Sequence, residues 1–587
     1  MKKIFALMLS VFMLMGCEDM FEPAIENILE KDFMYKDAQF AGGLLLNAYS
    51  MLPTNGWIHS DVATDNAVSN DPVNNFRRTA DGQWTSDNNP FEVWQNSYYA
   101  LQYVNLIING ADRVNWALDS IASLIYADRF RGEAYGLRAI FMLHLMQHHA
   151  GKAPDGELLG VPIITDYLEV NSDFNLPRGT FQKCMEFIYA DLDSAEALLP
   201  LDYAIAASSD ELYLNKYKDR GVSASAFERV FGSHGHGRMT RRIAEAIRAR
   251  AALFAASEAY SEGSSTTWED AANAAAKVLN RINGVGGFDA NGLSAWFGSA
   301  RDIDRLGAGL NSAEVLWRTE FVESVTLERE NYPPSLFGNG RINPTQNLVD
   351  AFPMANGYPI SHASSGYNPQ TPYLNRDARL AAYVVLNGSR FGATNTVIMT
   401  AVDDANNNNA LNRVETSTRT GYYLRKLMRP DISLNPATNK RHYRPHIRFT
   451  EIFLNYAEAA NEAWGPDGMA PGASYSARSV ISAIRNRAAV GKTNNDPYLA
   501  SITDKDGMRE LIRNERRLEL CFEDFRFWDL RRWKKELNET VKGVRIQGTE
   551  FTIFDVDTRQ YQDYMYYGPI PKSEVLKYDA LVQNQGW

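Results

Sequence analysis

Apolar residues recur at intervals of three and four along several stretches of the chain, which is the spacing that one face of an α-helix requires. The clearest stretch is 181–199, where apolar side chains keep this spacing from end to end. Thr180 is a suitable N-cap for this helix, and Pro200 ends it because proline lacks the amide hydrogen that a continuing helix needs. The same criterion predicts helices at 36–51, 92–110, 124–149, 240–260, 268–281, 450–464, 475–489 and 505–521.

The intervening segments are rich in Gly, Asn, Pro, Ser and Asp, a composition typical of loops. They cover 53–90, 200–239, 284–310 and 323–445. Short strand-like pieces occur at 383–387 and 397–402, and several helices are rich in alanine, which lets helices approach closely. No exact 34-residue repeat is visible. The chain is therefore predicted to be mostly α, with a helical frame at about 33–283 and 444–587 and a loop-rich lobe carrying short β strands at about 284–443.

The composition narrows the function. With 45% hydrophobic and 22% charged residues, the chain resembles ordinary globular proteins, and its net charge of -11 argues against a nucleic-acid partner. Its 11 Trp, 29 Tyr and 28 Phe exceed what a helical core of this size requires. Because Tyr and Trp combine an apolar ring with a polar group, some of them are expected on a ligand-contacting surface.

The N-terminus predicts export and lipid attachment. Lys2 and Lys3 precede an apolar run at 4–15, which is too short for the roughly 20 residues that span a bilayer but suits a signal peptide. The sequence LMGC that ends at Cys17 resembles a bacterial lipobox, in which cleavage precedes the cysteine and the thiol is lipidated. We therefore expect a signal peptide at 1–16, a lipid on Cys17 and an acidic tether at 17–32, since acyl chains hold a protein on a membrane.

Metal and cofactor motifs are weak. Cys184 and Cys521 are expected to be buried apolar residues, and no CxxC pair exists for a cysteine zinc site. His144 and His148 have a zinc-compatible spacing of four but lack the glutamate of H-E-x-x-H, so amphipathic packing explains them equally well. The segment from Asp504 begins like a calcium loop without its later ligands, which leaves a structural calcium ion elsewhere in the Asp-rich loops open. No P-loop, dinucleotide or serine-nucleophile motif appears, so no cofactor is expected.

Charges and aromatic rings alternate at helical spacing in NERRLELCFEDFRFWDLRRW (514–533). This pattern predicts partly buried arginine–carboxylate pairs that fix one helix against another. Catalysis by Glu519 or Glu523 is disfavoured, because neighbouring arginines would keep both carboxylates ionised.

Segments in order along the chain resemble the signatures of the SusD/RagB family, lipoproteins that partner TonB-dependent transporters in the Bacteroidetes. The most specific is 514–533, and the ending YYGPIPKSEVLKYDALVQNQGW (566–587) is similar to the family terminus, with Tyr578 where Asn is common. The other matching segments are 176–200, 237–254, 343–360, 375–380, 444–463 and 477–488.

This resemblance implies a fold and a function. The family fold is a single, mostly helical domain of tetratricopeptide-like hairpins with a looped lobe. Its members lie as lids on SusC-like TonB-dependent barrels in the outer membrane, and they bind oligosaccharides, or peptides in the RagB branch, without catalysis. The resemblance thus implies an outer-membrane, cell-surface protein whose partners are an oligosaccharide and a SusC-like transporter, with no nucleic acid.

Two loops carry the residues that a sugar would need, namely rings for its apolar face and polar groups for its hydroxyls. In the family, regions corresponding to 57–90 and 321–341 commonly face the ligand, and Trp296 between two glycines is a third candidate. The expected ligand-binding residues are Trp57, Asp65, Asn66, Arg77, Trp84, Trp296, Tyr332, Phe337 and Arg341.

Two other functions stay open at this stage. A peptide-binding RagB-type lid would also use Tyr and Trp, so the sequence separates it poorly from a glycan-binding protein. A secreted glycoside hydrolase would need two carboxylates across the scissile bond, and none here carries a catalytic motif.

Overall fold

The helical frame forms as the apolar periodicity predicts. The computed structural model describes residues 31–587, so the predicted signal peptide, the lipidation site Cys17 and tether residues 18–30 lie outside it. All nine predicted helices are present with ends shifted by a few residues, which confirms a mostly α fold. They are α2 (Ala38–Ser50), α4 (Trp94–Gly110), α5 (Ser120–His149), α6 (Phe181–Leu198), α8 (Arg241–Ala256), α9 (Trp268–Asn280), α15 (Phe449–Trp464), α16 (Ala477–Arg487) and α18 (Lys505–Leu520).

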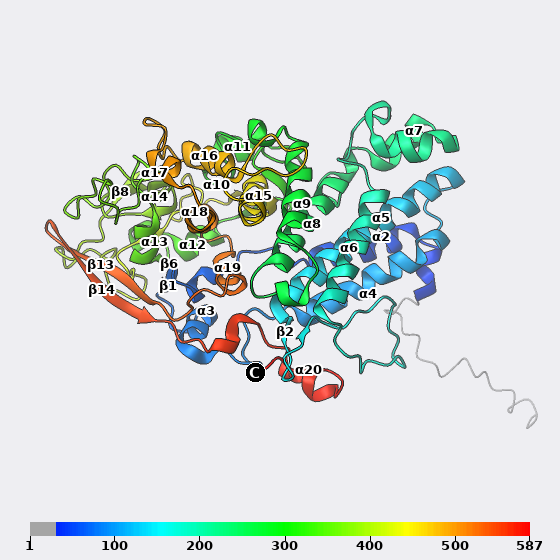
Figure 1. Ribbon diagram of the computed structural model, residues 1–587, viewed down its shortest axis with the longest axis horizontal. Helices are drawn as coiled ribbons and strands as arrows, with labels where there is room; N and C mark the ends of the chain where they lie inside the picture. The colour runs from blue at the N-terminus through cyan, green and yellow to red at the C-terminus, as the bar shows by residue number, and fades with distance from the viewer. Residues whose placement is uncertain (1–30) are drawn as a thin grey trace, which may run out of the picture.

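These helices pack on their neighbours in chain order. α2 contacts α4, α4 contacts α5, and the series continues through α6, α8 and α9 to α15, which then packs against α16 and α18 (Figure 1). Thr180 caps α6 as expected, since its side-chain oxygen accepts a hydrogen bond from the Lys183 amide at 3.2 Å. No helix within 31–587 combines the length and apolar character that a membrane span requires.

The lobe is built from short elements. Its helices are α10 (Ala295–Gly298), α11 (Ala300–Asp304), α12 (Thr326–Asn331), α13 (Gln346–Ala351) and α14 (Ala378–Tyr383). Its antiparallel strand pairs are β1 (Ala67–Ser69) with β6 (Ile342–Pro344), β4 (Val315–Arg318) with β12 (Pro445–Arg448), β5 (Val322–Ser324) with β11 (Lys440–His442), β7 (Val384–Val385) with β10 (Tyr423–Leu424), and β8 (Ser389–Phe391) with β9 (Thr396–Ile398). The strand-like piece 383–387 contains β7, whereas 397–402 overlaps β9 only at its start.

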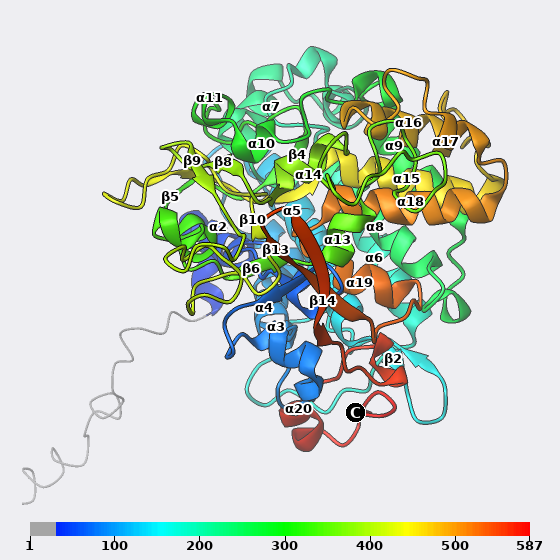
Figure 2. The same ribbon diagram turned by 90° about the vertical axis from the view of Figure 1, so that its left-hand side faces the viewer.

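The structure also contains several helices and strands that the sequence did not predict. The largest is a hairpin of β13 (Thr540–Gln547) and β14 (Glu550–Thr558), which lies at the left edge in Figure 1 and faces the viewer in Figure 2. The others are α3 (Asn75–Arg78), α7 (Ala224–Phe231), α17 (Pro497–Ser501), α19 (Arg526–Arg532), α20 (Lys572–Lys577) and the pair β2 (Gly151–Lys152) with β3 (Leu158–Leu159).

The core has two large parts that meet at α18. Apolar residues of the frame helices form one cluster, which includes Leu511 and Ile512 of α18. A second cluster fills the lobe and includes Leu518, at the end of the same helix, together with Phe522. Cys184 and Cys521 are buried free thiols, as predicted.

A buried ion network occupies this junction. Glu519 accepts hydrogen bonds from Arg487 at 2.8 Å and from Arg448 and Arg379 at 3.3 Å each. Arg448 also makes a bidentate pair with Glu523, at 2.7 and 2.9 Å. These contacts join α18 to β12, α14 and α16, so they confirm that the charged segment at 514–533 fixes elements against one another.

Candidate functional site

A groove of about 490 Å³ runs along the surface of the lobe beside the segment 55–59. The paired strands β5 and β11 form one wall, and the start of β6 with the segment after β1 forms another. Two aromatic rings, Trp57 and Tyr443, line it together with amide, hydroxyl and charged groups. The polar lining residues are Asn55, His59, Asp71, Asn74, Thr319, Ser324, Thr326, Glu330, Asn331, Arg341, His442 and Arg444.

Trp57 is held in place by Arg444 and by packing against the lobe core. The guanidinium of Arg444 lies over the indole ring, 4.4 Å from its centroid, and itself pairs with Asp524 at 3.1 Å. Asp524 also accepts hydrogen bonds from the backbone amides of Ile58 at 3.2 Å and Ser60 at 2.9 Å. The loop that carries Trp57 is therefore fixed before any ligand arrives, and the partly exposed ring lines the groove.

Arg341 retains hydrogen-bonding capacity. Its contacts to Glu330 at 3.6 Å and to the Asn70 side-chain oxygen at 3.3 Å are long, and both charged side chains are partly exposed. A guanidinium carries five N–H donors, so most of them are free of short contacts with residues 31–587. Arg341 and Glu330 can thus donate to and accept from the hydroxyls of a bound molecule.

His442 adds a titratable group to the wall. Its Nε2 lies 2.9 Å from a carboxylate oxygen of the buried Glu328. Burial alone would lower the pKa of His442, but the hydrogen bond and negative charge of Glu328 outweigh it and raise the pKa above its ordinary value. Glu328 thus favours the protonated form of His442 more than water does for a free imidazole.

The structure brings only two of the predicted ligand-binding residues into the groove, Trp57 and Arg341. Three predicted rings are instead buried, so the expectation that they face a ligand is wrong. Trp84 packs among Phe91, Phe527, Tyr561 and Trp587. Trp296 and Tyr332 belong to the lobe core, where the Tyr332 hydroxyl donates to the Arg429 carbonyl at 2.5 Å.

Two predicted polar residues are structural as well. Asp65 is buried and accepts two 2.8 Å hydrogen bonds from Arg526. Asn66 is buried between Asp61 and Arg517. The expectation that these two face the ligand is therefore also wrong. Arg77 and the 63% exposed Phe337 lie at the surface outside the groove lining.

The prediction missed Tyr443, His442 and Arg444. These residues lie shortly before the motif helix α15, at the predicted boundary between the lobe, which ended at 443, and the frame, which began at 444. They reach the groove because β11 pairs with β5, a contact between residues more than a hundred positions apart that no local pattern reveals. Among residues 31–587, no three His, Cys, Asp or Glu side chains are grouped to hold a metal ion.

Two family models and a relative of known sequence match this chain. A model of the SusD family matches residues 314–587, and a model described as starch-binding associating with outer membrane matches 32–209. The SusD-like protein P38 of Formosa agariphila is 21% identical over 567 residues, which cover 93% of this chain and 92% of that protein.

Solved structures share the fold. A SusD-like protein of Bacteroides fragilis superposes with a TM-score of 0.70 at 22% identity, covering 96% of this chain and all of that one. A SusD-like carbohydrate binding protein of the same species gives 0.69 at 20% identity, covering 93% and 99%.

Proposed function

Because this chain belongs to the SusD/RagB family, we propose that it binds an oligosaccharide in the groove and delivers it to a SusC-like TonB-dependent transporter of the outer membrane. The observation that carries the proposal is that the partly exposed ring of Trp57 lines the groove together with polar groups such as Arg341, whose protein contacts are long. A sugar presents the complementary surfaces, an apolar face of C–H groups and a rim of hydroxyls. The same ligand class is supported by the similar structure, which is that of a carbohydrate binding protein, and by the matching family model, which describes starch-binding proteins.

The groove has the size of a small-ligand site, since its volume falls within the roughly 300–1,000 Å³ typical of such sites. The proposal includes no reaction, and release of reducing sugars from polysaccharides by the protein alone would contradict it. Delivery to the transporter and attachment to the outer membrane are inferred from the family.

Replacing Trp57 by alanine should weaken oligosaccharide binding at least tenfold. A ring that covers about 100 Å² of apolar sugar surface contributes about 2.5 kcal/mol before losses, and about 1.4 kcal/mol corresponds to a factor of ten. Isothermal titration calorimetry with a glycan that binds the wild type measures the change, with Phe337→Ala as the exposed aromatic control outside the groove.

Unchanged affinity in Trp57→Ala would place the site elsewhere. The same titration should be run against pools of peptides, because tight binding of peptides with no glycan binding would identify a RagB-type protein.

Membrane attachment is expected to depend on Cys17, which lies outside the described residues. Cys17→Ala should move the protein from the membrane pellet to the soluble fraction, since no acyl chain can then be attached. Fractionation of cells followed by immunoblotting measures this, with Cys184→Ala as the matched control because that thiol is buried in the fold. Continued sedimentation of Cys17→Ala with the outer membrane would refute the anchor.

A further inference from the structure

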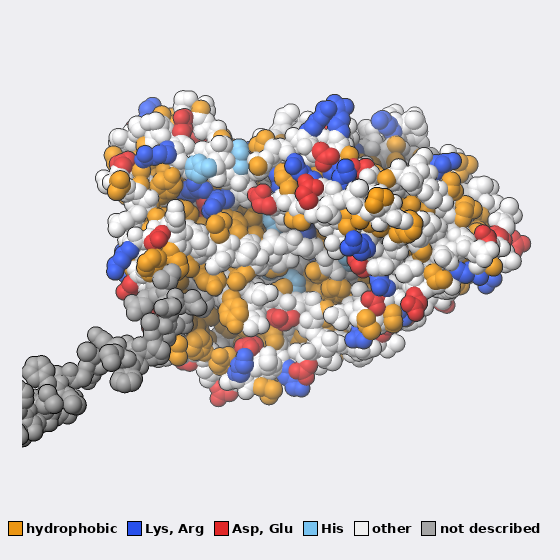
Figure 3. All heavy atoms as spheres, turned by 180° about the vertical axis from the view of Figure 1, so that it is seen from behind, with side chains coloured by type: hydrophobic (Ala, Val, Ile, Leu, Met, Phe, Trp, Pro, Cys, Tyr) orange, Lys and Arg blue, Asp and Glu red, His pale blue; other side chains and the backbone are white. Residues whose placement is uncertain are grey.

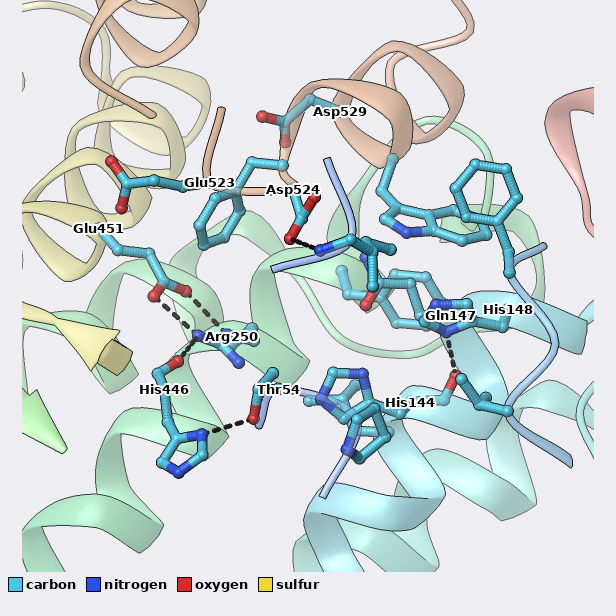
Figure 4. A pocket seen from close by; sticks show the side chains of 18 of the residues that line it. Thr54, His144, Gln147, His148, Arg250, His446, Glu451, Glu523, Asp524 and Asp529 are labelled. Carbon is cyan, nitrogen blue, oxygen red and sulfur yellow. Dashed lines mark hydrogen bonds and ion pairs between the residues drawn. The ribbon is translucent and has the colours of Figure 1, made fainter. Parts of the chain in front are cut away.

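A second cavity lies behind the groove and shares Trp57, Ile58 and Arg444 with it. Its volume is about 290 Å³, and its walls come from α5, α8, the start of α15 and the turn before α19. Figure 3 shows a hollow near the middle of one face in which histidine side chains are visible, and Figure 4 shows the cavity from close by. A single water needs only about 10–15 Å³, so the space is far larger than a solvation site.

His144 lines this cavity with its hydrogen-bonding groups unused. The residue is only 7% exposed, yet neither ring nitrogen has a hydrogen-bond partner among residues 31–587. Asn455, also in the lining, has an unpartnered side-chain NH₂ group in the same part of the described chain. Buried polar groups are nearly always satisfied, and leaving one unpaired costs about 1–3 kcal/mol. Two such groups around one cavity indicate that a polar ligand completes them.

His148 adds an acceptor to the same wall. Its Nδ1 lies 2.7 Å from the His144 carbonyl oxygen, which can only accept, so Nδ1 carries the proton. Burial lowers the pKa of His148 to about 4, with the His144 carbonyl opposing, so the ring is neutral at pH 7 and Nε2 keeps a lone pair. Gln147 on the same helix also lines the cavity (Figure 4).

Three arginines of the lining are already paired with carboxylates of the lining, whereas the exposed Glu92 has no ion pair within residues 31–587. Arg250 makes a bidentate pair with Glu451 at 2.7 Å for both bonds. Arg444 pairs with Asp524, and Arg516 pairs with Asp529 at 2.8 Å. An anion entering the cavity would therefore meet no unpaired cation within residues 31–587, so a neutral ligand is favoured over an anion.

The remaining walls are aromatic. Trp57, Phe525 and Trp528 line the cavity, and the Trp528 ring lies 4.5 Å from that of His148. Flat rings beside neutral donors and acceptors match the apolar face and hydroxyl rim of a sugar ring. At about 290 Å³ the space is near the lower limit of roughly 300 Å³ for small-molecule sites, which suits one ring rather than a chain.

We propose that this cavity is a second binding site, separate from the groove, that takes one neutral, polyhydroxylated ring of monosaccharide size and holds it through His144, Gln147 and Asn455. The choice of a sugar rests in part on the proposed function, but the cavity and its unpartnered groups do not. The ring is either a free monosaccharide or the terminal unit of a chain in the groove, with Trp57 between the two sites.

Titration of the full mature chain with glucose, galactose, mannose and N-acetylglucosamine tests this, by calorimetry and ligand-observed NMR. At least one neutral sugar should bind the wild type, and glucuronate should bind at least tenfold more weakly than its neutral counterpart glucose. His144→Phe should weaken binding at least tenfold without lowering the thermal midpoint, because the imidazole it removes has no partner in the described chain. Gln147→Ala, a milder change, should weaken it at least threefold.

The matched control is Arg341→Ala, which changes the groove alone. It should weaken oligosaccharide binding but leave monosaccharide binding within twofold. If His144→Phe also loses oligosaccharide binding, the cavity holds the terminal ring of a chain that lies in the groove. If His144→Phe still binds oligosaccharides, the cavity holds a free monosaccharide. The proposal is overturned if no neutral monosaccharide binds the wild type, or if His144→Phe and Gln147→Ala bind as the wild type does. If a monosaccharide binds while every oligosaccharide fails, the groove function falls and the cavity site stands.

Discussion

Glu519→Gln is expected to lower the free energy of unfolding by about 3–5 kcal/mol, the range found when one partner of a buried ion pair is removed. The substitution keeps the shape of the side chain but removes the negative charge that three buried arginines share. Burial alone would raise the pKa of Glu519, yet these arginines outweigh it and lower the pKa from 4.5 to about 2. At about 1.36 kcal/mol per pH unit, a shift of this size corresponds to about 3 kcal/mol.

The lowered pKa of Glu519 also predicts how the effect of the substitution on the free energy of unfolding changes with pH. A carboxyl whose folded-state pKa is lowered stabilises the fold above its unfolded pKa, and that contribution disappears as the pH falls through the folded value. The difference between the wild type and Glu519→Gln should therefore be full above about pH 5 and shrink between the ordinary pKa of 4.5 and about 2. Urea unfolding followed by circular dichroism at several pH values measures it.

Glu510→Gln is the matched control, because Glu510 lies on the same helix, is 62% exposed and pairs with Lys535 at 2.9 Å. Exposed pairs of this kind contribute about 0–1 kcal/mol. Equal effects of the two substitutions would show that the junction network does not stabilise the fold.

This network illustrates what a single sequence can reveal. The alternation of charge and aromatic residues at 514–533 indicates buried ion pairs, because such charges can be tolerated beside large rings only when they are compensated. The partners of Glu519, however, come from Arg379, Arg448 and Arg487. Their meeting depends on tertiary packing, which residue types alone do not specify.

Helices were predictable for a local reason. The spacing of apolar residues and a cap such as Thr180 act within a few residues, so they can be read directly from the chain. The hairpin at 540–558 also had a local signal, since Val541, Val544 and Ile546 point inward from a strand that ends before Gly548. It was missed because the whole of 444–587 was assigned to the helical frame.

Loop composition could not separate buried from exposed rings. The lobe has little regular structure but its own apolar core, so an aromatic residue in a glycine- and asparagine-rich loop can be fully enclosed, as Tyr332 is. Trp57 and Trp84 stand in loops of similar composition, and only the first lines the groove. Which ring is exposed depends on the packing of α19 and the chain end, far away in sequence.

Trp84→Ala should therefore destabilise the fold rather than the ligand complex, with a loss of about 3–5 kcal/mol in the free energy of unfolding. The indole is only 2% exposed, lies 4.7 Å from the Trp587 ring and 5.5 Å from that of Phe527, and donates to the Asn89 side chain at 2.9 Å. Its removal leaves a cavity between the loop, α19 and the C-terminus, which the surrounding rings can fill only partly.

Phe337→Ala tests whether replacing any aromatic residue of the loops by alanine lowers the stability as Trp84→Ala does. Phe337 was predicted as a ligand contact on the same grounds, but it is 63% exposed, so its removal should change the unfolding free energy by less than about 0.5 kcal/mol. Chemical denaturation gives both values, and calorimetry at a temperature where Trp84→Ala remains folded gives its glycan affinity. A Trp84→Ala variant with wild-type stability and no glycan binding would mean that the ring faces the ligand and that the core assignment is wrong. A destabilised Trp84→Ala variant that binds glycan normally when folded would place Trp84 in the scaffold that holds the groove.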